Sequence, residues 1–417
     1  MNSILAQSEY LTDRMPVEQL PPRIASFIRD KGLVSSVNGM KVSFCGLVCH
    51  EGRNYFFFPR KSDIYEILLK PEIYCNLLMQ SLLKFARFSR TQVHSPEDGA
   101  DEMGFDKLEL FRYLISDFQQ HGIFRDEEIL SRKNTGKTDW KRTLNRSVSY
   151  PDAKGNPVYL DVFGRQKTVS ISEITRIHAG ILARIYSRYG FLFGGKNAVP
   201  YSLLQYGESG LAVRAQIILL KHEARKHFAD RHTLLLGKLI DFLEALKGNQ
   251  DMNMVIGVTR FHVAWEHMLA RCFRNVIDIN RYLPKPVFLD NDGNSHIASR
   301  SGMRTDIVIE NREDRSLHVM DAKYYDATQV SSSPGWSDLV KQFFYEKALS
   351  QLFQFEGYQI RNSMIFPGKQ KFFDSIKMLD ECSRQFQDDY FPPIHCIYID
   401  PLDILKTYLD EKHLPDG

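Results

Sequence analysis

Two short apolar runs separated by a polar turn restrict the fold of this 417-residue chain. Residues 304–310 (RTDIVIE) and residues 317–323 (LHVMDAK) are each about as long as a strand and rich in β-branched and other apolar side chains. The six residues between them, 311–316, are polar and typical of a hairpin loop. The sequence therefore predicts two adjacent antiparallel strands in the last third of the chain.

The register of this hairpin decides which side chains meet. If Glu310 pairs with Leu317, Asp306 lies opposite Asp321. Directly opposed residues have Cβ atoms about 4.5–5.5 Å apart, and the period of two places Lys323 on the same face as Asp321. We therefore expect two carboxylates and one ammonium group to converge.

Such a convergence favours a metal-dependent reaction. Two neighbouring carboxylates repel each other unless a cation lies between them, and oxygen ligands suit Mg²⁺, with Mn²⁺ as an alternative. A bound Mg²⁺ ion keeps several waters, so a phosphate oxygen and an activated water fit beside it. Lys323 would orient this water, act as its base if its pKa is depressed, or neutralise charge on the phosphate. We expect phosphodiester hydrolysis.

Two flanking helical patterns add polar side chains. Upstream, Glu266 lies in an amphipathic pattern and is either a third acidic metal ligand or a solvated helix residue. Downstream, Asp338 is expected to cap a helix on which Gln342 and Tyr345 share a face. Their polar groups would hold Lys323 or a DNA phosphate, although Tyr345 is also compatible with an ordinary core aromatic.

This order of elements resembles the PD-(D/E)XK nuclease superfamily over about residues 255–400. Within this region, three short sequences resemble those of the LlaJI-type restriction endonucleases and their McrC-like relatives. They are VAWE, which ends at Glu266, DAKYY, which begins at Asp321, and QFFY, which begins at Gln342. Thr305 stands where the superfamily often has Pro. The resemblance implies a Mg²⁺-dependent DNA endonuclease with these active-site residues: Glu266, Asp306, Asp321 and Lys323, the three acids being the metal ligands.

The resemblance also implies a setting for the reaction. McrC-like chains work in restriction, a form of antiviral defence, beside a separate AAA+ motor subunit that hydrolyses nucleotide. Gly136-Lys-Thr138 does not match a P-loop, because Ser131 replaces its first glycine and the sequence pattern predicts no strand before it, so the motor would be another chain. Two alternatives stay open: a catalytically silent DNA-binding or motor-stimulating adaptor, and a structure-specific or RNA-directed nuclease that uses the same site.

Composition limits the partners. The net charge of +3 argues against a histone-like binder, so a DNA surface must be a local patch. No apolar stretch approaches the ~18 residues that span a bilayer, and the six cysteines show no CxxC pair. We therefore expect a cytoplasmic protein with reduced thiols. A homo-oligomer is compatible with this composition.

A basic segment around one tryptophan is the candidate patch. Between residues 132 and 146, bases outnumber the single acid Asp139. Basic side chains around an aromatic grip a phosphate backbone or stack on a base, whereas the alternative is a solvated loop with its tryptophan packed inward. The predicted nucleic-acid-binding residues are Lys133, Lys137, Trp140, Lys141 and Arg142.

The patterns predict three parts. Residues 1–130 are expected to form an α+β domain for DNA contact or partner docking, and residues 131–250 a basic loop followed by helices, including one long helix over about residues 211–246. Residues 251–417 are expected to form an α/β PD-(D/E)XK nuclease domain with a mixed central sheet, to which residues 362–366 and 395–399 add strands.

Overall fold

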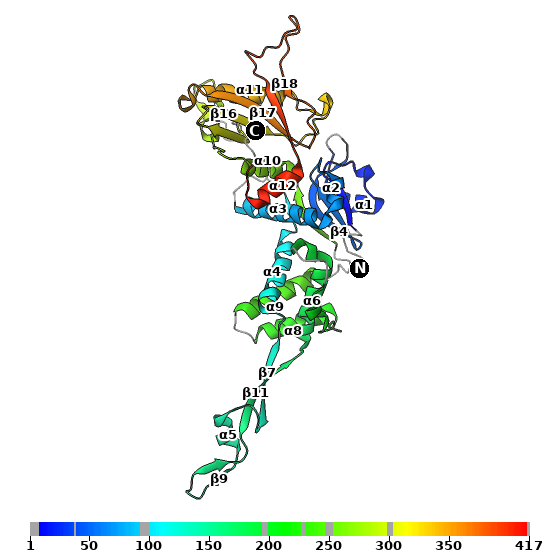
Figure 1. Cartoon of the computed structure of the whole chain (residues 1–417), viewed down its shortest axis with the longest axis vertical. Coiled ribbons are helices and arrows are strands. Elements are labelled where there is room, and N and C mark those ends of the chain that lie inside the picture. The colour runs from blue at the N-terminus through cyan, green and yellow to red at the C-terminus, as the bar shows by residue number, and fades with distance from the viewer. Residues whose placement is uncertain are drawn as a thin grey trace. The chain divides into compact units, whose positions relative to one another are not determined.

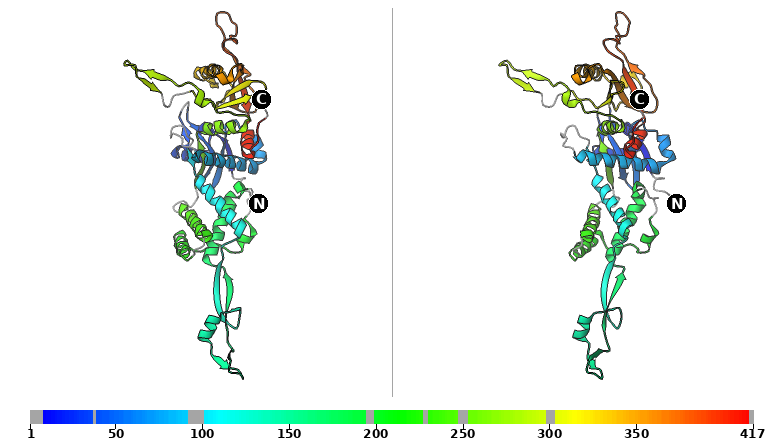
Figure 2. Two further views of the ribbon diagram at one scale, coloured as in Figure 1. Left: turned by 90° about the vertical axis from the view of Figure 1, so that its left-hand side faces the viewer. Right: turned by 60° about the vertical axis from the view of Figure 1, so that its left-hand side comes forward.

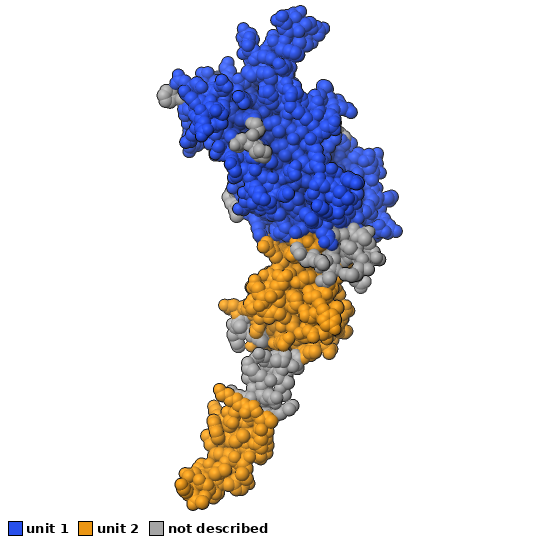
Figure 3. Space-filling view, in the orientation of Figure 1, with its two compact units in different colours: residues 1–105, 251–417 blue, residues 106–250 orange. Residues whose placement is uncertain are grey.

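The computed structural model describes residues 8–36, 39–91, 101–193, 199–226, 230–246, 253–297 and 303–414, with elements labelled as in Figure 1. The chain forms two compact units (Figure 3). Unit 1 comprises residues 1–105 and 251–417, and unit 2, residues 106–250, is inserted between these two stretches. The predicted division into three domains stays a prediction, because one compact unit can contain two domains.

The first sheet of unit 1 joins strands from both ends of the chain. Its order is β1 (Ser8–Thr12), β5 (Arg53–Phe58), β4 (Phe44–His50), β12 (Met254–Thr259) and β6 (Glu102–Met103). β1 is parallel to β5, and the other pairs are antiparallel. Gly46 of β4 pairs with Gly257 of β12, where a Cβ atom on either glycine would lie 2.2 Å from a backbone oxygen. The close approach of these strands therefore requires glycine.

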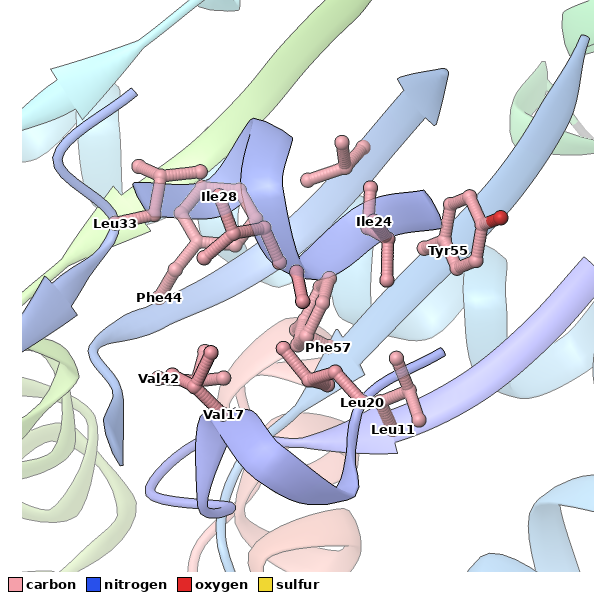
Figure 4. Packing of buried hydrophobic residues seen from close by; sticks show 12 residues of the cluster. Leu11, Val17, Leu20, Ile24, Ile28, Leu33, Val42, Phe44, Tyr55 and Phe57 are labelled. Atoms are coloured by element: carbon pink, nitrogen blue, oxygen red, sulfur yellow. The ribbon is translucent and has the colours of Figure 1, made fainter. Parts of the chain in front are cut away.

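One face of this sheet is closed by the N-terminal segment. The helix α1 (Pro22–Asp30) and the short turn η2 (Val17–Gln19) pack on strand residues, and β2 (Val34–Ser35) pairs with β3 (Lys41–Val42) beside them. Ile24 and Ile28 of α1 meet Phe44 and Phe57 of the sheet (Figure 4). This apolar layer fixes the position of β5, whose end reaches the candidate site.

A helical layer connects the two ends of unit 1. It contains α2 (Ile64–Leu69), α3 (Pro71–Thr91), α10 (Phe261–Cys272) and α12 (Pro401–Asp410), and α3 contacts both α10 and α12. The Ser81 hydroxyl of α3 donates a 3.1 Å hydrogen bond to the Leu405 carbonyl of α12. The N-terminal residues thereby pack directly on the C-terminal helix.

The second sheet of unit 1 is mixed, as predicted. Its order is β15 (Ile307–Asn311), β16 (Ser316–Ala322), β17 (Gln359–Pro367), β19 (Ile394–Ile399) and β18 (Ser375–Ile376). β16, β17 and β19 are parallel, while β15 and β18 run antiparallel to their neighbours. α11 (Trp336–Ser350) covers one face through Tyr345 and Leu349, which contact Leu317 and Val319.

Short elements complete this half. The turns are η4 (Asn280–Tyr282), η5 (Val330–Ser332) and η6 (Phe353–Phe355). β13 (Val287–Leu289) and β14 (Ser295–Ile297) form a separate hairpin that projects from the body of unit 1 (Figure 2).

Unit 2 combines a helical body with a β-ribbon. The helices are α4 (Phe105–His121), α6 (Glu173–Tyr189), α7 (Tyr201–Leu204), α8 (Val213–Ala224) and α9 (Asp230–Ala245), with the turn η3 (Gly190–Phe193). β7 (Asp126–Lys133) pairs with β11 (Phe163–Ser170) to form the ribbon (Figure 2). The ribbon ends in β8 (Lys137–Thr138), α5 (Trp140–Arg146), β9 (Ser149–Pro151) and β10 (Pro157–Tyr159).

The prediction of one long helix over about residues 211–246 is wrong, because α8 ends at Ala224 and α9 begins at Asp230. The two helices contact each other, and periodicity alone does not separate one long helix from two that share a core. Arg231, which interrupts the apolar pattern, donates two 2.9 Å hydrogen bonds to Asp117 of α4. None of the described helices combines the length and apolar character needed to cross a membrane.

Candidate active site

The hairpin has the predicted register. Glu310 pairs with Leu317 and Ile307 pairs with Met320, so the residue before Ile307 comes opposite Asp321. Asp306 is this residue, one position ahead of β15, and its Oδ2 accepts a 2.9 Å hydrogen bond from the backbone N–H of Ala322. The carboxylate of Asp306 is thereby held at the end of β16.

Lys323 lies directly after β16 and is paired with two acids. Its backbone N–H donates a 2.9 Å hydrogen bond to the Ile365 carbonyl, which extends the pairing with β17. Its Nζ lies 2.6 Å from Oδ2 of Asp321 and 2.9 Å from Oδ1 of Asp338. Burial lowers the pKa of Lys323, but the two carboxylates outweigh burial and hold this pKa above its ordinary value. The ammonium form is favoured, so a role as general base is not.

Glu266 approaches the same group from α10. Burial, and then the negative charges of Asp306 and Asp321, raise the pKa of Glu266. The pKa of Asp306 is raised in the same way, by burial first and by Asp321 next. The Glu266 carboxyl is partly buried and lies within electrostatic reach of both aspartates, so the solvated alternative is not favoured.

Gln342 and Tyr345 of α11 are both buried, and neither is hydrogen-bonded to Lys323 among the residues that the structure describes. Their other predicted role, contact with a DNA phosphate, stays a prediction. The Tyr345 hydroxyl donates a hydrogen bond to the carbonyl of Arg304, two residues before Asp306. The side chain of Gln342 is fully buried, and neither of its polar atoms has a hydrogen-bond partner among the residues that the structure describes. Tyr345 therefore orients the segment that carries Asp306, and not the lysine.

Asp338 is the site residue that the sequence prediction placed in a different role. It was expected to cap a helix, but α11 begins at Trp336 with Gly335 as its N-cap, and Asp338 lies in the first turn. Its carboxylate contacts Lys323 and accepts a 3.3 Å hydrogen bond from the Tyr325 hydroxyl. The sequence signal for this role is an acidic residue at the start of the helix predicted after the DAK sequence.

The first sheet braces the segment after Lys323. The Arg60 backbone N–H donates a 2.7 Å hydrogen bond to the Tyr324 hydroxyl, and the Arg60 guanidinium donates one of 3.1 Å to the Tyr324 carbonyl. Lys61 forms a 2.7 Å ion pair with Asp326. The Tyr324 ring also packs near Trp265 of α10. Residues from the N-terminal and C-terminal stretches of unit 1 thus fix the loop beside the lysine.

The side chains present fit a hard divalent cation in their chemistry. Three acids, Glu266, Asp306 and Asp321, offer oxygen ligands only. Burial, together with repulsion from neighbouring carboxylates, raises the pKa of Glu266 and of Asp306, so their charged forms call for a compensating cation. Over the described part of the chain, no group of three or more His, Cys, Asp or Glu side chains is arranged so that it could hold a metal ion as it stands. The Lys323 ammonium group instead compensates Asp321.

The predicted nucleic-acid-binding residues lie in unit 2, at the end of the ribbon. Asp139 caps α5 by accepting a hydrogen bond from the Arg142 backbone N–H, and Trp140 is 59% exposed, so it is not packed inward. Lys133 forms a 3.0 Å ion pair with Asp161. Lys137, Lys141 and Arg142 are exposed. The end of the ribbon therefore carries both exposed basic side chains and an accessible aromatic ring.

Comparisons with known proteins agree with the family resemblance. The type II restriction enzyme BsuMI component YdjA of Bacillus subtilis (strain 168) is 24% identical over 296 residues, which cover 66% of this chain and 60% of that relative. The chain thus spans about 60% of the length of the curated relative it matches.

Among solved structures, a half-complex of Thermococcus gammatolerans McrB AAA+ hexamers with bound McrC contains a similar chain. The match has 14% identity and a TM-score of 0.37 over 97% of this chain and 99% of that chain, a score too low to establish a shared fold. The model of the LlaJI restriction endonuclease family matches residues 44–400. Because this match covers most of its length, the chain belongs to the LlaJI restriction endonuclease family.

Proposed function

We propose that the chain is the nuclease subunit of a restriction system and that it hydrolyses DNA phosphodiester bonds with Mg²⁺. The observation that carries this proposal is the meeting of Asp306, Asp321 and Lys323 at the open end of one hairpin, with Glu266 beside them. Membership of a restriction endonuclease family supports the same activity. We propose further that residues 251–417 are a PD-(D/E)XK nuclease domain.

Each residue has a role in this proposal. Glu266, Asp306 and Asp321 would hold the cation, which lowers the pKa of a bound water and compensates phosphate charge. The Lys323 ammonium group would donate hydrogen bonds to a phosphate oxygen and stabilise the charge that develops there. Asp338 would position Lys323, since it contacts the ammonium from the other side.

The proposal includes DNA contact and a motor partner. The exposed basic side chains around Trp140 would contact the phosphate backbone away from the cleaved bond. The Bacillus subtilis relative is named a component of a restriction enzyme, which supports a role as one subunit of several. The resemblance to McrC-like chains points to a separate AAA+ subunit as the motor, working in antiviral defence.

Nicking of supercoiled plasmid tests the activity directly. We expect the wild-type chain to nick with Mg²⁺ or Mn²⁺, alone or after addition of the co-encoded motor, and not with EDTA. Lys323→Ala should lower the nicking rate by about 10²–10³-fold, the usual cost of losing one preorganised donor at a reacting oxygen. Lys412→Ala removes an exposed lysine, paired with Asp410 at the end of α12, and should keep the wild-type rate.

Two results would contradict the proposal. Equal nicking by wild type and Lys323→Ala would assign the activity to a contaminant or another site. Absence of nicking in every condition, with DNA binding or motor stimulation intact, would favour the catalytically silent adaptor. Cleavage of RNA or of branched DNA, but not of plasmid, would keep the site and change the substrate class.

A further inference from the structure

The outward face of α11 carries two large aromatic side chains that are exposed. Trp336 is 65% exposed and Phe344 is 60% exposed. Val340 lies between them at intervals of four residues, so all three occupy one side of the helix. The opposite side of α11 buries Gln342 and Leu349. An exposed aromatic row on a helix whose other face is well packed requires an explanation.

A hollow lies beside this row. Its volume is about 450 Å³, within the range of sites that hold small molecules. The lining residues are Pro286, Met303, Arg304, Val340, Lys341, Phe344 and Tyr345. The hollow therefore has an apolar and aromatic wall with two cationic side chains.

These two cations are available to an anion. Arg304 and Lys341 are both exposed, and within the part of the chain that the structure describes neither forms an ion pair with a carboxylate. A hollow that combines exposed positive charge with aromatic faces suits a nucleotide, whose phosphate is anionic and whose base stacks on a ring. Charge complementarity thus selects a nucleic acid over an apolar peptide.

The hollow adjoins the candidate active site. Arg304 is two residues before Asp306, and its carbonyl accepts the hydrogen bond of Tyr345, which also lines the hollow. Two turns before Tyr345 on the same helix, Asp338 contacts Lys323. A DNA strand with one phosphate at Asp306 and Lys323 would have the next nucleotide at the hollow.

We infer that this hollow binds one unpaired nucleotide of the DNA strand, next to the phosphate that is cut. The base stacks on Phe344, and Arg304 and Lys341 contact its phosphates. The base must be unpaired because both faces of a base in a duplex are covered by its neighbours, so Phe344 has nothing to stack on there. This inference rests on the proposed nuclease function and adds that the substrate is locally unwound or distorted at the cut.

Fluorescence anisotropy of short oligonucleotides tests the inference without cleavage. The full chain is titrated in EDTA, at one fixed salt concentration, with labelled single-stranded dT12 and with a blunt 12-base-pair duplex. Phe344→Ala should weaken binding of dT12 by about 5- to 150-fold, which corresponds to base stacking of about 1–3 kcal/mol. Binding of the duplex should change less than twofold. Phe344→Trp keeps a stacking face and should keep the wild-type affinity for dT12.

The matched control is Phe386→Ala, which removes an aromatic ring of equal exposure, 61%, from another segment of unit 1. It should leave both affinities unchanged. If Phe344→Ala binds dT12 as tightly as Phe386→Ala does, the inference is overturned, and the aromatic row is left to a protein partner. If the wild-type chain binds dT12 through Phe344 but never nicks plasmid, the nuclease proposal fails while the binding site stands.

Discussion

The ion pairs of Lys323 with Asp321 and Asp338 allow a quantitative prediction about the free energy of unfolding of unit 1. The side chain of Lys323 is 15% exposed, and those of its partners Asp321 and Asp338 are 7% and 12% exposed. Removing one partner from a buried pair costs about 3–5 kcal/mol, because the remaining charge stays buried without compensation. Since these groups keep some contact with solvent, we expect Lys323→Ala to lower the free energy of unfolding of unit 1 by about 2–4 kcal/mol.

The nearby ion pair of Lys61 with Asp326 supplies the comparison. Its distance is 2.7 Å, close to the 2.6 Å between Lys323 and Asp321, but its side chains are 38% and 36% exposed. Exposed pairs contribute about 0–1 kcal/mol, so Lys61→Ala should cost less than 1 kcal/mol. The two variants therefore separate the effect of burial from that of distance.

Urea unfolding of unit 1 in EDTA, followed by the fluorescence of buried Trp265, measures both variants. The double variant Lys323→Ala/Asp338→Ala should recover part of the loss, because one uncompensated carboxylate is gone. If Lys323→Ala and Lys61→Ala lost the same stability, or if the double variant were less stable than Lys323→Ala, the account of burial and compensation would be wrong.

Two further predictions concern other parts of the chain. Burial lowers the pKa of His178 from 6.5 to about 4, so the neutral form is favoured in the folded state. The contribution of His178 to the stability of unit 2 is therefore complete above pH 6.5 and is lost as the pH falls toward 4. In urea titrations, the free energy of unfolding should fall by up to about 3 kcal/mol over this range. His178→Asn, which keeps an acceptor for the Phe124 N–H, should remove this dependence. Gly257→Ala would place a Cβ atom 2.2 Å from a backbone oxygen and should lower the melting temperature of unit 1, whereas Gly237→Ala in α9, where the Cβ meets no atom within 4 Å, should raise that of unit 2.

The sequence predicted what depends on neighbours in the chain. The register that brings Asp306 opposite Asp321 follows from strand alternation and a short loop, both of which are local. The strands at residues 362–366 and 395–399 were found from apolar runs for the same reason. Local patterns, however, do not state which strands pair across long separations.

The parts that sequence patterns missed depend on such long separations. β12 pairs with β4, about 200 residues earlier, and no periodicity within either strand indicates this partner. The role of Asp338 was missed because its partner Lys323 approaches from another element, whereas an acid near a helix start ordinarily indicates a cap. The helix break between Ala224 and Asp230 was hidden by the apolar side that both helices bury.

The pairing of β6 with β12 has a consequence for how this architecture can vary. The chain leaves unit 1 just after β6 and re-enters at β12, and these strands are hydrogen-bonded neighbours, with Met103 opposite Gly257. Residues 106–250 therefore form an insertion between two neighbouring strands of one sheet. A short linker across that gap would leave every strand of both sheets of unit 1 in place, so the insertion can change in length or sequence without a change in the strand order of unit 1.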